Sequence, residues 1–195
     1  MFEGRGFGGH FIKILVTGVS GFLGGRLAKH LAKDHEVWGI YRSTLPTQLE
    51  SVPNLTLIQD DLANPQRLPE ECEYVVHAAA DTPQTTKDKA QLYRSNLDGM
   101  RQLLQWCERA GVKRFLFCST MAVYGQIEEE WINEATPSRT PNAYGASKVA
   151  AELALEQWSA QQKTCRSVTV RLPGVVGREA KNTFLPIAIQ KIFKV

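Results

Sequence analysis

The sequence has no long hydrophobic run, no closely paired cysteines and no strong excess of one charge, and each absence excludes a class of protein. No apolar stretch approaches the roughly 18 residues of a membrane-spanning helix, and the first residues lack the hydrophobic region of a signal peptide. The 23 Lys and Arg against 20 Asp and Glu leave a net charge of +3, which is too small and too evenly spread for a nucleic-acid or membrane-surface partner. The basic residues are therefore interpreted as part of a solvated surface.

The four cysteines are interpreted as small buried apolar residues. They form no C-x-x-C pair and lack metal-ligand spacing, so we expect no metal site. Three of them fall in segments with the pattern of a buried strand or helix, as expected of small apolar side chains in the reducing cytoplasm. The cysteines are Cys72, Cys107, Cys118 and Cys165.

The composition is that of one globular domain. The chain has 195 residues, of which 43% are hydrophobic and 22% charged, and this is enough for one sizeable core. Residues 1–11 begin with a glycine-rich stretch and are expected to form a flexible leader. Residues 12–180 are then expected to form the domain itself.

Apolar strand patterns alternate with helical patterns along the chain. This alternation predicts an α/β fold with a doubly wound parallel sheet, the Rossmann fold. A long connection over 122–142 follows the fifth strand, at the edge where such sheets bind ligands. The predicted strands are 12–17, 36–41, 55–59, 74–80, 114–119 and 167–172, and the predicted helices are 21–33, 88–110 and 144–162.

Three glycines, Gly18, Gly21 and Gly24, join the first strand to the first helix. At this spacing they permit a tight turn and a close approach of the backbone to a pyrophosphate, which the N–H groups of the helix N-terminus then bind. Phe22 and Leu23 belong to the same loop and helix start. A packing loop without a ligand is the alternative, but the position between a strand and an amphipathic helix favours dinucleotide binding.

The end of the second strand indicates which dinucleotide binds. An acidic residue there would hold the adenosine ribose and favour NAD, whereas an arginine accommodates the 2′-phosphate of NADP. This strand ends in Tyr41, Arg42 and Ser43. Arg42 therefore favours NADP over NAD, with a solvated loop charge as the alternative interpretation.

Tyr144 and Lys148 lie four residues apart at the start of the helix that follows the fifth strand. This spacing places the phenol and the ammonium on one face of the helix. A phenol has a pKa near 10, and a neighbouring positive charge favours its deprotonated form, so that it can exchange protons near neutral pH. An ordinary surface pair is the alternative interpretation.

These motifs resemble the short-chain dehydrogenase/reductase superfamily, and the T-G-x-x-G-F-L-G loop is similar to its extended branch, the NAD-dependent epimerase/dehydratase family. The stretch from Cys118 to Gly125 resembles that family's S-S-S/T-x-x-V-Y-G sequence and implies a catalytic hydroxyl at Thr120, with Ser119 as the alternative. Tyr144 and Lys148 take the catalytic tyrosine and lysine positions. The resemblance implies that both also bind the cofactor, Lys148 at the nicotinamide ribose, and that Thr120 and Tyr144 contact the substrate.

The same resemblance implies further cofactor and substrate contacts. Asp61 and Leu62 match the family's adenine-binding segment. Ala78 and Ala79 match its H-x-A-A strand end, along which the cofactor lies. Pro173 lies in a segment similar to the one beside the nicotinamide, and Asn182 and Thr183 begin an N-x-x-P stretch that opens the nucleotide-sugar site.

The implied enzyme uses NAD or NADP for hydride transfer to or from a hydroxyl or carbonyl, the substrate being a nucleotide sugar in that family. The alternatives are an NADPH-dependent reductase of small aldehydes or ketones and a non-catalytic dinucleotide-binding fragment. Met121 and Ala122 stand where dehydratases of the branch have an acid pair, which disfavours dehydration. The resemblance further implies a homodimer through the long helices, and residues 181–195 as the start of a truncated substrate-binding region.

Overall fold

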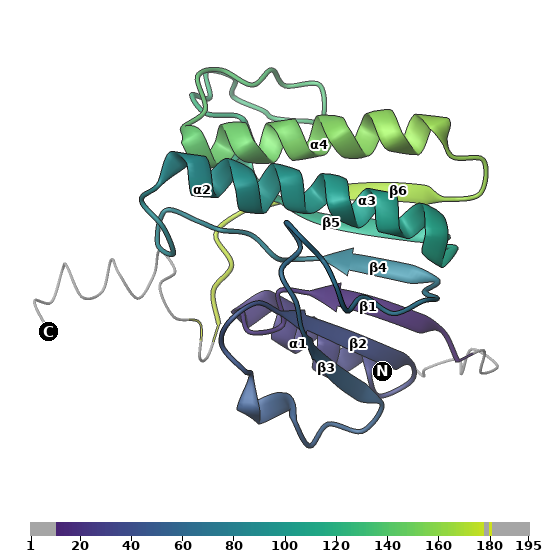
Figure 1. The fold of residues 1–195 in the computed structure, drawn as a ribbon. Helices are drawn as coiled ribbons and strands as arrows, with labels where there is room; N and C mark the ends of the chain where they lie inside the picture. The colour runs from purple at the N-terminus through teal and green to yellow at the C-terminus, as the bar shows by residue number, and fades with distance from the viewer. Residues whose placement is uncertain (1–10, 178–179, 181–195) are drawn as a thin grey trace, which may run out of the picture.

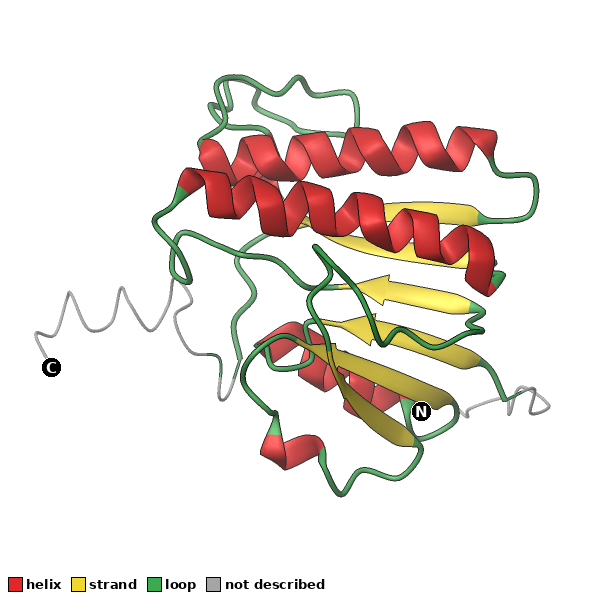
Figure 2. Ribbon diagram, in the orientation of Figure 1, coloured by secondary structure: helices red, strands yellow, loops and turns green. Residues whose placement is uncertain are grey.

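The computed structural model describes residues 11–177 and residue 180. They form a three-layer α/β unit in which strands and helices alternate along most of the chain, except that no helix lies between β3 and β4 (Figures 1 and 2). The strands are β1 (Lys13–Thr17), β2 (Glu36–Tyr41), β3 (Leu55–Gln59), β4 (Tyr74–His77), β5 (Arg114–Thr120) and β6 (Arg166–Leu172). The helices are α1 (Phe22–Leu31), α2 (Lys89–Tyr93), α3 (Gly99–Ala110) and α4 (Ala143–Gln161), with short helical turns at Thr47–Leu49, Arg94–Asp98 and Met121–Val123.

The six strands form one parallel sheet in the order β3-β2-β1-β4-β5-β6. The chain builds outward from β1 to β3, then crosses back to place β4 on the other side of β1. Strand order therefore reverses between β1 and β4, and ligands of open parallel sheets bind at such a point, beyond the carboxyl ends of the strands. The predicted doubly wound Rossmann fold is confirmed.

Helices cover the two faces of the sheet, so the central strands are buried on both sides. α1 packs on one face, where Val16, Ala28 and Val37 belong to one buried cluster. α3 and α4 lie side by side on the other face (Figure 1), where Leu103 and Leu155 belong to a second cluster. Burial on both faces explains why the sequence of β1 is continuously apolar rather than alternating.

The predicted helix over 88–110 is continuous but not uniform. It begins at Lys89 after Asp88 accepts the N–H of Ala90, and it widens to a π-helical turn at Arg94–Asp98 before α3. Within this turn the side chain of Asn96 is buried and bonds both backbone groups of Asp81, with the Asp81 N–H 2.8 Å from Oδ1. The π turn thus fixes the connection that leaves β4.

The fourth strand is shorter than predicted. It ends at His77 rather than at residue 80, because the N–H groups of Ala78 and Ala79 donate to the side chain of Thr17 instead of continuing the strand ladder. Residues 1–10 of the predicted leader, and the segment with Asn182 and Thr183, lie outside the described residues. Within the described part of the chain, no helix is both long and apolar enough to cross a membrane.

Candidate functional site

The glycine loop after β1 has the backbone geometry that its sequence predicts. Gly18 has a φ of 74°, and a Cβ added there would lie 2.7 Å from the Cα of Ala79. A Cβ on Gly24 would lie 2.8 Å from the carbonyl carbon of Gly18. A side chain at either position would push the loop away from β4 or from α1, so the close approach depends on glycine.

The N-terminus of α1 opens toward this loop. Gly21 is its N-cap residue, and among the described residues no side chain caps the helix. Its first turn, which includes Phe22 and Leu23, has no acidic residue. The first N–H groups and the positive end of the helix dipole are therefore free to bind an anion, and the loop fits a pyrophosphate.

A buried hydrogen-bond network joins the end of β1 to the end of β4. Oγ1 of Thr17 accepts the N–H groups of Ala78 and Ala79 at 3.2 and 3.1 Å, so its hydroxyl proton donates to Nδ1 of His77 at 2.8 Å. The His77 ring stacks on Phe117 with the ring centroids 5.4 Å apart. Burial, and to a lesser degree Lys148, lower the pKa of His77 to about 3, so this imidazole is neutral.

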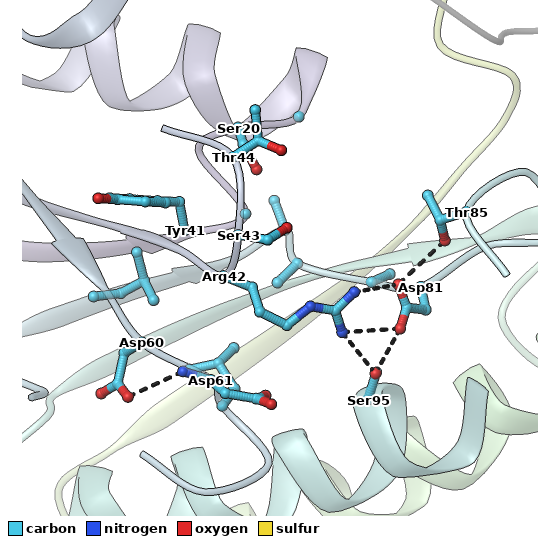
Figure 3. Close-up of a pocket in the computed structure, with 17 residues that line it drawn as sticks. Ser20, Tyr41, Arg42, Ser43, Thr44, Asp60, Asp61, Asp81, Thr85 and Ser95 are labelled. Carbon is cyan, nitrogen blue, oxygen red and sulfur yellow. Dashed lines mark hydrogen bonds and ion pairs between the residues drawn. The ribbon is translucent and has the colours of Figure 1, made fainter. Parts of the chain in front are cut away.

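A cavity of about 540 Å³ extends from this loop across the ends of β2 and β3 (Figure 3). Asp61 lines it and keeps one carboxylate oxygen bonded to the N–H of Ala63, whereas the neighbouring Asp60 is buried and accepts the N–H groups of Gln66 and Arg67. Asp60 therefore holds the loop, and Asp61 faces the cavity. The predicted cofactor residues in the lining are Gly18, Gly21, Arg42, Asp61, Leu62, Ala78 and Ala79.

Arg42 is not an isolated loop charge. Its guanidinium forms an ion pair with Asp81, with Nη2 3.0 Å from Oδ1, while its side chain stays 46% exposed at the cavity. Arg42, the residue predicted to bind the 2′-phosphate, thus lines the cavity and is already paired with a carboxylate.

Tyr144, Lys148 and Thr120 meet at the carboxyl end of β5. Asn142 caps α4 by accepting the N–H of Gly145 at 2.9 Å, which sets where the helix begins. Burial raises the pKa of the Tyr144 phenol, and a side-chain hydrogen bond with Thr120 opposes that rise. The predicted phenol and hydroxyl are therefore neighbours.

Lys148 is buried beneath this pair. Its Nζ donates to the carbonyl oxygen of Cys118 at 2.9 Å and lies 4.0 Å from the centroid of the Phe117 ring. Burial lowers the pKa of Lys148 to about 8. Among the described residues no carboxylate is hydrogen-bonded to the ammonium, although the nearby charge of Glu152 opposes part of this lowering of its pKa.

Ser119, the alternative to Thr120, forms a hydrogen bond with a different residue. Its hydroxyl donates to the carboxylate of Glu152, which also accepts hydrogen bonds from Nε and Nη2 of Arg171, at 3.1 and 2.7 Å. The geometry thus favours Thr120 as the hydroxyl beside Tyr144. Pro173 follows β6 and is exposed.

Three residues of the site were missed at the sequence level. Thr17 bonds the ends of β1 and β4, Asp81 pairs with Arg42, and Glu152 holds Ser119 and Arg171. The sequence could have indicated Glu152, because it lies four residues after Lys148 and therefore on the same face of the helix. Nothing in the local sequence indicates Thr17 or Asp81, because Thr17 bonds residues that are 60 to 62 positions away and Arg42 lies 39 positions before Asp81.

Comparison with known proteins gives consistent results. The model of the NAD dependent epimerase/dehydratase family matches residues 14–194. GDP-6-deoxy-D-mannose reductase of Pseudomonas aeruginosa is 36% identical and aligns with 75% of this chain and 47% of its own length. UDP-glucose 4-epimerase of Streptococcus mutans is 30% identical and aligns with 84% of this chain and 52% of its own. The chain thus spans about half the length of the curated relatives it matches.

Two solved structures with the same fold are complexes with NAD. UDP-glucuronic acid 4-epimerase from Bacillus cereus, in complex with UDP-glucuronic acid and NAD, superposes with a TM-score of 0.82 at 25% identity, over 94% of this chain and 63% of that one. The Bordetella bronchiseptica enzyme WbmH, in complex with NAD+, has a TM-score of 0.79 at 26% identity, over 95% and 64% of the two chains.

The buried neutral His77 predicts a pH-dependent stability. Because its pKa is lowered on folding, the unfolded chain binds the proton more readily, and the contribution of His77 to stability is lost as the pH falls below about 6.5. His77→Asn keeps a hydrogen-bond acceptor for Thr17 without the titration. We expect the advantage of the wild type over this variant in free energy of unfolding, measured with urea, to shrink by up to about 1.4 kcal/mol per pH unit between pH 6 and pH 4. An advantage that stays constant over this range would contradict the buried neutral imidazole.

Proposed function

The chain belongs to the NAD dependent epimerase/dehydratase family, and on this premise we propose that it is the dinucleotide-binding part of an enzyme that oxidises and reduces a hydroxyl or carbonyl group of a nucleotide-linked sugar. The observation that carries the proposal is the placement of Thr120, Tyr144 and Lys148 at the end of β5. β5 is two strands from the Gly18 loop at the end of β1, on the same edge of the sheet. Relatives and solved structures named as nucleotide-sugar epimerases support the choice of substrate class.

The residues divide the chemistry between them. Tyr144 exchanges the proton with the substrate oxygen, and Thr120 hydrogen-bonds that oxygen as charge develops on it. The buried ammonium of Lys148 favours the phenolate form of Tyr144. A nicotinamide dinucleotide supplies the redox chemistry when bound. The glycine loop and the N-terminus of α1 would hold its pyrophosphate, since both lack the side chains that would block it.

The choice between NAD and NADP is argued from Arg42. We propose that Arg42 meets the adenosine 2′-phosphate and favours NADP, with Asp61 at the adenine and Leu62, Ala78 and Ala79 along the cofactor. Pro173 is assigned beside the nicotinamide, and Asn182 and Thr183 to the substrate, by resemblance alone. The four free cysteines fit a cytoplasmic protein.

Reduction of a ketone or aldehyde is the second candidate for the net reaction. Arg42 favours it, because NADPH is the usual donor for reductions, and a relative named as a reductase has 36% identity. Epimerisation and reduction use the same proton exchange at Tyr144, so both proposals assign the same roles to this residue and Lys148.

Two glycines with the same φ of 74° provide a matched test of dinucleotide binding. Gly18→Ala places a methyl group against the backbone of Ala79, whereas Gly111→Ala meets nothing within 4 Å. Both variants carry the strain of a left-handed conformation, roughly 1–2 kcal/mol. We expect Gly18→Ala to weaken NADH and NADPH binding at least about tenfold and Gly111→Ala to leave it unchanged, by fluorescence titration. Equal affinities in both variants, or a wild type that binds neither dinucleotide, would overturn the cofactor site.

Tyr144→Phe separates an enzyme from a binding module. Removing the phenolic hydroxyl removes the proton exchange, so we expect turnover of a panel of UDP- and GDP-linked sugars to fall at least about 100-fold while NADPH binding is retained. Tyr74→Phe on β4 is the control and keeps full turnover, since Tyr74 pairs with Arg114 at the amino end of β5, the opposite end from Thr120. Wild-type turnover in Tyr144→Phe would refute the catalytic assignment. A wild type that binds the cofactor but converts no substrate would support the non-catalytic alternative.

We also propose a homodimer through the long helices on one face of the sheet. α3 and α4 lie side by side there (Figure 1), and Leu153 of α4 is 51% exposed. An apolar side chain on this face would be buried between two copies. Sedimentation equilibrium is expected to give twice the mass of the chain for the wild type and a lower average mass for Leu153→Glu; a monomeric wild type would exclude this dimer.

A further inference from the structure

Arg42 is held by a carboxylate from another strand connection. Its Nη1 and Nη2 atoms donate to Oδ2 and Oδ1 of Asp81, each over 3.0 Å, and Nη1 also donates to the hydroxyl of Ser95 over 3.0 Å. Because β1 lies between β2 and β4 in the sheet, the Arg42 side chain crosses the end of β1 to reach Asp81 (Figure 3). The ion pair therefore spans the edge at which the dinucleotide is proposed to bind.

Asp81 is a fixed partner rather than a mobile surface acid. It is 4% exposed and accepts hydrogen bonds from the hydroxyls of Ser95 and Thr85, at 2.6 and 3.1 Å, and from the amide of Gln91 at 3.3 Å. Burial alone would raise its pKa, but the hydrogen bonds from Arg42, Ser95 and Gln91 outweigh burial and lower the pKa to about 2. The carboxylate is therefore ionised at all physiological pH values.

Arg42 keeps one edge available to a ligand. The described residues occupy three of the five guanidinium N–H groups and leave Nε and one N–H of Nη2 without such a partner. These two groups lie on one edge of the guanidinium, the arrangement that binds a phosphate through two parallel hydrogen bonds. Arg42 can thus hold a phosphate while it remains bonded to Asp81.

The charge available to that phosphate is nevertheless reduced. A phosphate monoester carries between one and a half and two negative charges near pH 7. It would be attracted by Arg42 and repelled by Asp81, which bonds the adjacent edge of the guanidinium, so part of the Coulomb attraction is offset. What remains favourable is the geometry of the two hydrogen bonds.

From this geometry we propose that Asp81 is a specificity-determining residue for the dinucleotide: it offsets the charge of Arg42 and thereby limits the preference for a 2′-phosphate, so that the site accepts both NAD and NADP. This inference rests on the proposed dinucleotide site. It adds to that function a positioning residue that acts through Arg42 and has no predicted contact with the reacting atoms.

The test compares the affinities of NADPH and NADH, measured by fluorescence titration on the full chain. We expect the wild type to bind NADPH less than about tenfold more tightly than NADH. Asp81→Asn keeps the shape of the side chain and an oxygen acceptor but removes its charge, and it should raise the NADPH/NADH affinity ratio about tenfold. Adenosine 2′,5′-bisphosphate and 5′-AMP should show the same change, because they contain the adenosine end alone.

Two controls separate the local effect from general ones. Asp98→Asn removes an exposed acidic charge from the turn before α3 and should leave the ratio unchanged. Ser95→Ala removes a hydrogen bond from Asp81 but keeps its charge, and should change the ratio less than Asp81→Asn does. Circular dichroism verifies that each variant is folded.

The outcomes distinguish this inference from the proposed function. A ratio that is unchanged or lower in Asp81→Asn, in a protein that still binds both dinucleotides, would overturn the role of Asp81 and leave the cofactor site intact. If Asp81→Asn does not fold, the wild type alone decides, because a preference for NADPH above about 100-fold would contradict an offset charge. A wild type that binds neither dinucleotide would overturn both proposals.

Discussion

The bond between the Thr17 hydroxyl and the first residues after β4 is the contact on which the candidate site depends. This contact takes the place of the backbone hydrogen bonds between β1 and β4 where the two strands end. It therefore holds the two strand ends together at the point where the strand order reverses. Gly18 then passes against Ala79 at a distance that only glycine permits. The glycine loop, the cavity and the neutral His77 all lie around this one connection, and each would shift if the two strand ends separated.

The buried charges of Asp81 and Lys148 have opposite environments, and the difference indicates their roles. Asp81 is surrounded by donors and paired with Arg42, so its charge is stabilised. Lys148 is bonded to a carbonyl oxygen and an aromatic face, and burial makes its charged form less stable. A charge that is fully satisfied organises structure, whereas one that is not remains available to a reacting group. This contrast agrees with the proposed chemistry at the end of β5 and the proposed binding selectivity at the end of β2.

Much of this arrangement could be predicted from local sequence. Continuous apolar runs and glycine spacing predicted the parallel sheet and the phosphate loop, because both patterns reflect short-range rules of burial and backbone geometry. The spacing of Tyr144 and Lys148 predicted a shared helix face for the same reason. The π turn at Arg94–Asp98 and the early end of β4 were not predicted, since each depends on a side chain from a distant part of the chain.

The sequence by itself determined the fold class, the glycine loop and the identity of the residues at the end of β5, because each is encoded by neighbours within one strand, turn or helix. Only the tertiary structure favoured Thr120 over Ser119, through the bond from Ser119 to Glu152. It alone paired Arg42 with Asp81 across the end of β1. The physical reason is that hydrogen-bond partners are chosen by distance in space, and the parallel sheet brings together strand ends that are far apart in the chain.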